Sequence, residues 1–244
     1  MRVRELNTHI DTPMAHYMTM TEMALESLRK SILQGELKPG TQLVPAKLEK
    51  QMALSREAIR DAIRQIVGYG LAETITNKGT YVAQPLTLAE LEEIFELRMH
   101  AEPAIAAIAL NHLTQDQVKA LAHLTTQMES LTESRESLAD HFIMNREFHL
   151  SLYQPAGWNH LHRCIALWFD QILIFRSCLC RREMYKDFLT FNQDHQNILK
   201  GIRDKDADQL KALVKANLQS GIENIKRTYS VELQKQIDLN KKKR

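Results

Sequence analysis

Apolar residues recur at helical spacing in the front third of the chain. The first stripe, in the segment 21–35, consists of Leu25, Leu28, Ile32 and Leu33. A turn follows around Pro39-Gly40, and Pro45 then favours the start of a short second helix over 46–52. The stretch 55–70, SREAIRDAIRQIVGYG, predicts a third helix with Ser55 as its N-cap and glycines at its end.

The pattern then changes from helical to alternating. LAETIT and TYVA alternate on either side of Asn77-Lys78-Gly79, which predicts a small β-hairpin with a tight turn. Helices followed by a hairpin are typical of a winged helix-turn-helix. We therefore predict such a domain over 21–84, preceded by a flexible arm over 1–20.

Helical periodicity resumes at Thr87, a plausible N-cap, and no strand pattern follows. Pro103 is expected to bend or interrupt the first long helix. The later helices are predicted at 114–131, 138–153, 159–182, 188–203 and 206–229. The fold class is thus mainly α, with an all-helical domain of six or seven helices over 87–229 and a basic tail over 230–244.

The amino-acid composition indicates where the protein is located more clearly than what it does. The net charge is only +2, so nucleic-acid binding has to be argued from pattern rather than from a basic surface. Three cysteines (Cys164, Cys178, Cys180) without CxxC spacing argue against a disulfide framework or a zinc site. The first 20 residues contain no apolar h-region, and no apolar run reaches about 20 residues, so we expect no signal peptide, no membrane span and a cytoplasmic protein.

Three arginines recur every fourth residue along the predicted third helix: Arg56, Arg60 and Arg64. Taken alone, such a stripe favours a solvated helix face over a helix that enters the DNA major groove. Asp61 stands three residues before Arg64, so an ion pair between them competes with a DNA contact.

Several motifs in order resemble the DNA-binding domain of the GntR family of bacterial transcription regulators. They are LRKSILQGELKPGTQL, SREAIRDAIRQIVGYGLAE and NKGTYVA. The resemblance implies that Arg56 and Arg60 contact an operator and that Gly79 lets the wing approach the DNA backbone. The family's Glu-Arg pair is replaced by Pro45-Ala46, so Lys47 is a candidate substitute. The predicted DNA-binding residues are Lys47, Ser55, Arg56, Arg60, Arg64, Lys78 and Gly79.

The helical part resembles the FCD effector domain of FadR-type GntR regulators. The resemblance rests on LTLAELEEIFELRMHAEPAIA, NREFHLSL and DHQNILKGIRDKDADQLKALVKANL. It implies a helical bundle with a ligand cavity and a homodimer that binds a double-stranded, palindromic operator.

Many FCD domains bind a divalent metal through one Asp and three His. The matching positions here are Asn145, His149, His195 and Asn217, so two ligands are replaced by amides. We expect Zn²⁺ or Ni²⁺ to bind weakly, if at all, because an amide oxygen is a poor ligand for these ions. The hypothesis is that the four residues line a polar pocket that binds an organic effector directly. Interior histidines without a ligand role remain an alternative for His149 and His195.

Arg98 completes the predicted effector pocket, since a buried guanidinium holds a carboxylate through two hydrogen bonds. An i,i+4 ion pair with Glu102 is an equal alternative. The sequence therefore predicts a transcription regulator, more often a repressor in this family, that responds to a small carboxylate. The alternatives are a metal-assisted enzyme using His149 and His195, or a DNA-binding protein with a vestigial pocket. No catalytic residues are assigned.

Overall fold

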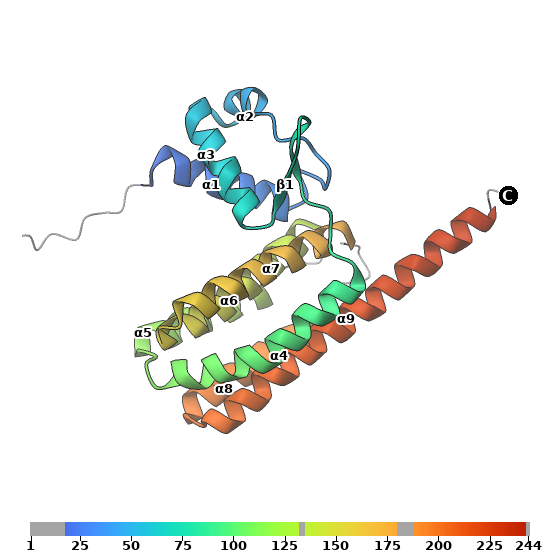
Figure 1. Ribbon diagram of the computed structural model, residues 1–244. Helices are drawn as coiled ribbons and strands as arrows, with labels where there is room; N and C mark the ends of the chain where they lie inside the picture. The colour runs from blue at the N-terminus through green and yellow to red at the C-terminus, as the bar shows by residue number, and fades with distance from the viewer. Residues whose placement is uncertain (1–17, 132–134, 180–187, 243–244) are drawn as a thin grey trace, which may run out of the picture.

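The computed structural model describes residues 18–131, 135–179 and 188–242, and Figure 1 shows two parts within them. A small N-terminal part carries the two-stranded sheet and lies on a larger bundle of long helices. The predicted arm over 1–20 lies almost wholly outside the described residues, since only Met18 and Thr19 precede the first helix.

The N-terminal part is a winged helix-turn-helix, as predicted. Its elements are α1 (Met20–Leu33), α2 (Pro45–Met52), α3 (Arg56–Gly68), β1 (Ala72–Ile75) and β2 (Gly79–Val82). The two strands pair antiparallel with Ala72 opposite Val82, and Gln42 forms an isolated bridge with Tyr81. Buried apolar side chains from all three helices form its core, among them Leu28, Leu48 and Ile59.

Side-chain caps begin helices in both parts, at Ser55 and Thr87 as predicted and at Thr19, which had been assigned to the N-terminal arm. Thr19 and Thr87 each form a capping box with the glutamate three residues on, which satisfies backbone N–H groups of the first turn. The Ser55 hydroxyl accepts a hydrogen bond from the Ala58 N–H at 3.2 Å. These caps therefore set where α1, α3 and the first helix of the bundle begin.

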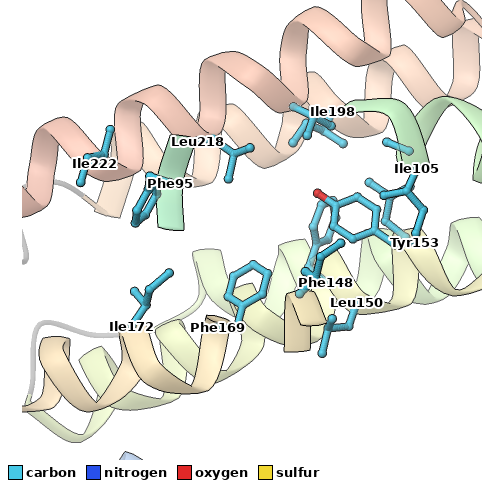
Figure 2. Packing of buried hydrophobic residues seen from close by; sticks show 14 of the residues in the cluster. Phe95, Ile105, Phe148, Leu150, Tyr153, Phe169, Ile172, Ile198, Leu218 and Ile222 are labelled. Atoms are coloured by element: carbon cyan, nitrogen blue, oxygen red, sulfur yellow. The ribbon is translucent and has the colours of Figure 1, made fainter. Parts of the chain in front are cut away.

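Six helices and one short 3₁₀ turn make up the described part of the bundle. They are α4 (Leu88–Leu110), α5 (Gln115–Glu129), α6 (Arg135–Tyr153), η1 (Gln154–Ala156), α7 (Asn159–Leu179), α8 (Phe188–Asp204) and α9 (Ala207–Lys242). In Figure 1, α4 lies alongside α9 on the side away from the N-terminal part, whereas α6 and α7 lie beneath that part. The apolar core lies between these two groups of helices (Figure 2).

At two places a helix continues where an interruption or an end was expected. Pro103 does not interrupt α4, which runs unbroken from Leu88 to Leu110 with Pro103 buried in it. Packing of α4 along α9 stabilises the helix against the loss of one backbone hydrogen bond. The last helix also does not end at Tyr229, because α9 continues to Lys242 through most of the predicted tail.

Candidate DNA-binding surface and effector pocket

The three arginines of α3 lie on its exposed side, while the opposite side holds buried Ile59, Ala62 and Ile66. Their side-chain partners differ. Arg56 Nε donates to Glu49 Oε2 of α2 at 2.8 Å, and Arg64 pairs with Asp61 as the spacing suggested. Arg60 has no ion pair within the described residues. It is therefore the arginine of α3 that can turn to a DNA base without giving up a protein partner.

The tip of the wing is held in shape by two hydrogen bonds to one carbonyl. Gln42 Nε2 and the Tyr81 hydroxyl donate to Lys78 O at 2.9 and 3.0 Å. Gly79 has a φ of +108°, which a side chain would strain, and a Cβ there would lie 3.0 Å from Gln42 Nε2. A groove between α3 and the wing is lined by Arg60, Arg64 and Gly79 among others.

The remaining predicted DNA-binding residues have different places. Lys47 is exposed on α2, and Lys78 is exposed at the wing tip. Ser55 is exposed as well, but its hydroxyl is engaged as the N-cap of α3. The structure thus assigns Ser55 a local structural role, and it leaves the lysine ammonium groups open to solvent.

A cavity of about 50 Å³ lies inside the bundle, between α4, α6, α7 and α9. Its polar lining comes from Arg98, Asn145, His149 and Asn217, which were predicted, and from His141 and Arg176, which were not. The apolar lining is Phe95, Phe142, Phe169, Ile172, Leu173 and Leu218, with Gly221. Figure 2 shows Phe169 and Ile172 of α7 pointing toward Phe95 and Leu218 on the opposite side.

Arg98 lines this cavity and also forms the ion pair that was its alternative. Its side chain is 3% exposed, and it bonds Glu102, which is 0% exposed, through Nε and through Nη2 at 3.3 Å. The guanidinium also stacks over Phe169 with its Cζ 4.0 Å from the ring centre. The ion pair with Glu102 is therefore present, and it positions a guanidinium that borders the cavity; that Arg98 also holds a carboxylate ligand stays a prediction.

The network continues from Glu102 to the first predicted metal-binding histidine. The Tyr153 hydroxyl donates to Glu102 Oε2 at 2.8 Å and accepts from His149 Nδ1 at 2.9 Å. Burial, together with the electrostatic effect of the neighbouring His195 and Arg98, holds the pKa of His149 well below its usual value. Burial and the Glu102 carboxylate raise the pKa of Tyr153 well above its usual value. Both rings are therefore neutral near pH 7.

Asn217 links the two halves of the predicted metal site. Its amide hydrogen-bonds both His149 and Asp194, whose pKa is raised by burial. The His149 and His195 rings lie 5.4 Å apart between centroids, at an angle of 61°. The structure thus brings His149 close to His195 and hydrogen-bonds His149 to Asn217, while Asn145 borders the same cavity. His195, which was predicted to line the effector pocket, is not one of the residues that line this cavity.

The donor set at this site does not match a tight metal site. Across the described residues, no three His, Cys, Asp or Glu side chains converge in a way that would hold an ion. A metal here would rely on two imidazoles and on amide oxygens, and His149 Nδ1 is already engaged by Tyr153. The arrangement resembles the hydrogen-bonded lining of an organic-ligand pocket more closely.

Two lining residues escaped the sequence analysis. His141 is buried and bonds Asn192 through Nε2 at 3.1 Å, and burial lowers its pKa to about 3. Arg176 is buried, stacks over Phe142 at 4.4 Å, and donates to Asn224 Oδ1 at 3.3 Å. His141 could have been found, because His141, Asn145 and His149 are spaced four apart on one helix face. Arg176 stands out only as a charge in an apolar segment.

A winged helix-turn-helix with a solvent-facing arginine helix, followed by a helical bundle around a polar cavity, defines a ligand-responsive type of DNA-binding regulator. Two family models match the chain in the corresponding places. The model described as "Bacterial regulatory proteins, gntR family" matches residues 20–82, and the FCD domain model matches residues 93–220. The chain belongs to the GntR family of bacterial transcription regulators, in the FadR-type group that carries an FCD domain.

Relatives along nearly the whole chain carry the same assignment. The chain is 25% identical over 214 residues to the HTH-type transcriptional repressor GlaR of Escherichia coli (strain K12), covering 84% of this chain and 96% of GlaR. It is 23% identical over 222 residues to the repressor RspR of the same strain, covering 89% and 93%. Its homologues are named as transcriptional repressors and regulators, and this chain is a DNA-binding transcription regulator of the same family.

Solved structures agree on the fold. The structure of E. coli McbR/YncC matches with a TM-score of 0.70 at 19% identity, covering 88% of this chain and 100% of that chain. A putative GntR regulator from Rhodococcus sp. RHA1 matches with a TM-score of 0.68 at 16% identity, covering 84% and 96%.

Among the described helices, none combines the length and the apolar character that a membrane crossing requires.

Proposed function

We propose that this chain is a cytoplasmic homodimeric repressor without catalytic activity, which binds a palindromic operator and releases it when a small carboxylate enters the helical domain. The curated repressors that it resembles favour repression over activation. Two copies of α3 would enter successive major grooves of the operator, about one helical turn apart. Arg60 would read a base there, with Lys47 and Lys78 on the phosphates.

The lining of the cavity is the observation that carries the effector class. Two guanidinium groups and two side-chain amides border it, and none of its described lining residues is an aspartate or a glutamate. Glu102 balances the charge of Arg98, and His141 and His149 are neutral, so the argument rests on hydrogen-bond donors: the guanidinium and amide groups of the lining suit a carboxylate. A volume of about 50 Å³ fits a compact acid rather than a long acyl chain.

We infer that the acid binds directly rather than through a metal. Asn145 and Asn217 offer amide donors to a carboxylate, whereas they are weak ligands for Zn²⁺ or Ni²⁺. Elemental analysis of protein purified without chelator tests this point. Substoichiometric zinc and nickel are expected, and one tightly bound ion per chain would overturn the direct-binding version.

The function is tested with a DNA fragment from upstream of the chain's own gene. Fluorescence anisotropy should give saturable binding at physiological salt that competes poorly with unrelated DNA. A thermal-shift panel of acetate, lactate, succinate and citrate, with the matching amides as controls, then probes the cavity. An acid that raises the melting temperature should also weaken DNA binding. Binding no tighter than to unrelated DNA would overturn operator recognition at that fragment.

A further inference from the structure

Helix α7 has two faces that contact different parts of the molecule. One face carries Leu167, Asp170, Gln171 and Ile174, which lie against the DNA-binding domain. The other carries Phe169, Ile172 and Arg176, which line the cavity. Both sets repeat at steps of three and four residues, so each forms a stripe along one helix. Figure 1 shows α7 between the N-terminal part and the rest of the bundle.

The contact with the DNA-binding domain has a charged centre. Asp170 Oδ1 accepts from Arg29 Nη2 of α1 at 2.6 Å and from Arg146 Nε of α6 at 2.6 Å. The Asp170 side chain is only 5% exposed, so this shared carboxylate is shielded from solvent. One carboxylate therefore ties a helix of the DNA-binding domain to two helices of the bundle.

The same face of α7 reaches the residues just after the arginine helix. A Cβ placed on Gly70 would lie 3.1 Å from Gln171 Nε2 and 3.7 Å from Leu167 Cδ1. Gly70 follows the C-cap of α3 and has a φ of +68°, so the backbone itself approaches α7 here. A displacement of α7 would therefore change the contacts at the C-terminal end of α3.

Two side chains contact both the cavity and the core of the DNA-binding domain. Phe142 of α6 and Leu173 of α7 line the cavity, and both pack in the apolar cluster formed with α1 and α3. Phe142 also carries the Arg176 guanidinium on its ring at 4.4 Å. No layer of other side chains therefore separates the cavity from the core of the DNA-binding domain at these two positions.

We propose that α7 is the coupling helix: a change at its cavity face shifts its position against Arg29 and Gly70, and so changes how firmly α3 is held. Packed helices respond to a ligand by small rigid shifts rather than by continuous deformation, and both states then differ in their contacts. The physiological meaning of this coupling rests on the proposed function, but the coupling itself is a property of the folded chain.

The test measures hydrogen–deuterium exchange of α3 amides (residues 56–71) in the full chain without DNA or acid. Ile172→Ala removes a cavity-lining side chain from α7, and Ile165→Ala is its control, since Ile165 is buried on the same helix and does not line the cavity. Ile172→Ala should raise the exchange rate of the α3 amides at least about twofold more than Ile165→Ala does. A twofold difference corresponds to the smallest interaction energies found between groups in contact. Ile172→Val serves if the alanine variant does not fold.

A second pair of variants tests the charged contact. Arg29→Gln and Arg146→Gln each remove one 2.6 Å bond to the same oxygen, but only the first bond joins the two domains. Arg29→Gln should raise α3 exchange more than Arg146→Gln, and it should reduce the added effect of Ile172→Ala. Equal effects of Ile172→Ala and Ile165→Ala on α3, or of the two arginine variants, would overturn the proposal. An acid panel without hits would leave these results standing, so the two failures are distinguishable.

Discussion

The arginines of α3 and the arginines packed inside the bundle have opposite environments. On α3, the side chains of Arg56 and Arg64 are 53% and 75% exposed, and their carboxylate partners are exposed or half-buried neighbours. In the bundle, Arg98, Arg146 and Arg176 are buried or nearly so, and each is fixed by a carboxylate, an amide or an aromatic ring. The same side chain thus serves as an exchangeable surface charge in one domain and as part of the core in the other.

This difference sets what each arginine can do. An exposed ion pair contributes little to folding, so its arginine can trade a carboxylate for a DNA phosphate at small cost. A buried pair is expensive to break because the remaining charge is left without solvent. The arginines of α3 should therefore matter for DNA affinity, and the buried arginines of the bundle should matter for stability and for the shape of the cavity.

The largest expected effect comes from leaving a buried guanidinium without its carboxylate. Glu102→Ala should lower the free energy of unfolding by about 3–5 kcal/mol, because Arg98 and Tyr153 both lose their partner. Urea denaturation followed by circular dichroism measures the change. Asp116→Ala is the matched control, since Asp116 pairs with Lys119 on the surface and its loss should cost under about 0.5 kcal/mol. Equal costs would break the comparison.

The next largest effect is on DNA affinity, and it compares two exposed arginines of α3. Arg60→Ala should weaken operator binding by about 1–3 kcal/mol per half-site, with unchanged stability, because Arg60 is exposed and has no ion pair within the described residues. Arg64→Ala should cost less, since Arg64 must first leave Asp61. Anisotropy titrations over a range of salt measure both. A loss of unfolding free energy in Arg60→Ala would contradict the assignment.

A pH titration tests the buried lining of the cavity. The folded chain holds the pKa of His141 at about 3, whereas an unfolded chain binds that proton near pH 6.5. The free energy of unfolding should therefore be highest above pH 6.5 and should decrease as the pH is lowered. His141 alone should account for a loss of about 2 kcal/mol between pH 7.5 and pH 5. Urea midpoints across this range should slope less steeply in His141→Gln. An identical slope would mean that His141 is not buried as described.

The smallest effect concerns backbone shape rather than charge. Gly79→Ala should cost about 1 kcal/mol of stability, because its φ of +108° is strained for alanine and Gln42 would be displaced. DNA affinity should fall a few-fold, since the wing tip loses the Gln42 bond to Lys78 O. Gln42→Ala separates the two causes: it should lower affinity without the backbone strain. Unchanged DNA affinity in both variants would show that the wing tip is not part of the DNA-binding surface.

The DNA-binding domain was largely predictable because its signals are local. Ser55 as a cap, the alternation around Asn77-Lys78-Gly79 and the arginine spacing all act within a few residues. The continuation of α4 through Pro103 was not predictable from such signals, since contacts with α9, over a hundred residues away, stabilise it. The roles of Arg56 and Lys47 at DNA stay predictions.

The pocket was only half predictable. His149 and Asn217 followed from the family resemblance, yet Arg176 and Phe142 enter the cavity because α6 and α7 meet α9 in space. Periodicity gives the face of a helix but not its neighbour, so charges such as Arg29 and Asp170 could not be paired from the sequence. Whether the pocket binds an acid or a metal likewise stays a prediction.

The contact between Gly70 and Gln171 limits how freely the two domains can be exchanged. A chimera that joins this DNA-binding domain to a relative's helical domain at the 83–87 junction would keep α1 and α3 but lose Asp170 and Ile174 beneath them. Such a chimera should still fold and bind DNA, yet it should respond poorly to the relative's ligand. A biosensor built from this chain would need to carry α7 together with the domain that it supports.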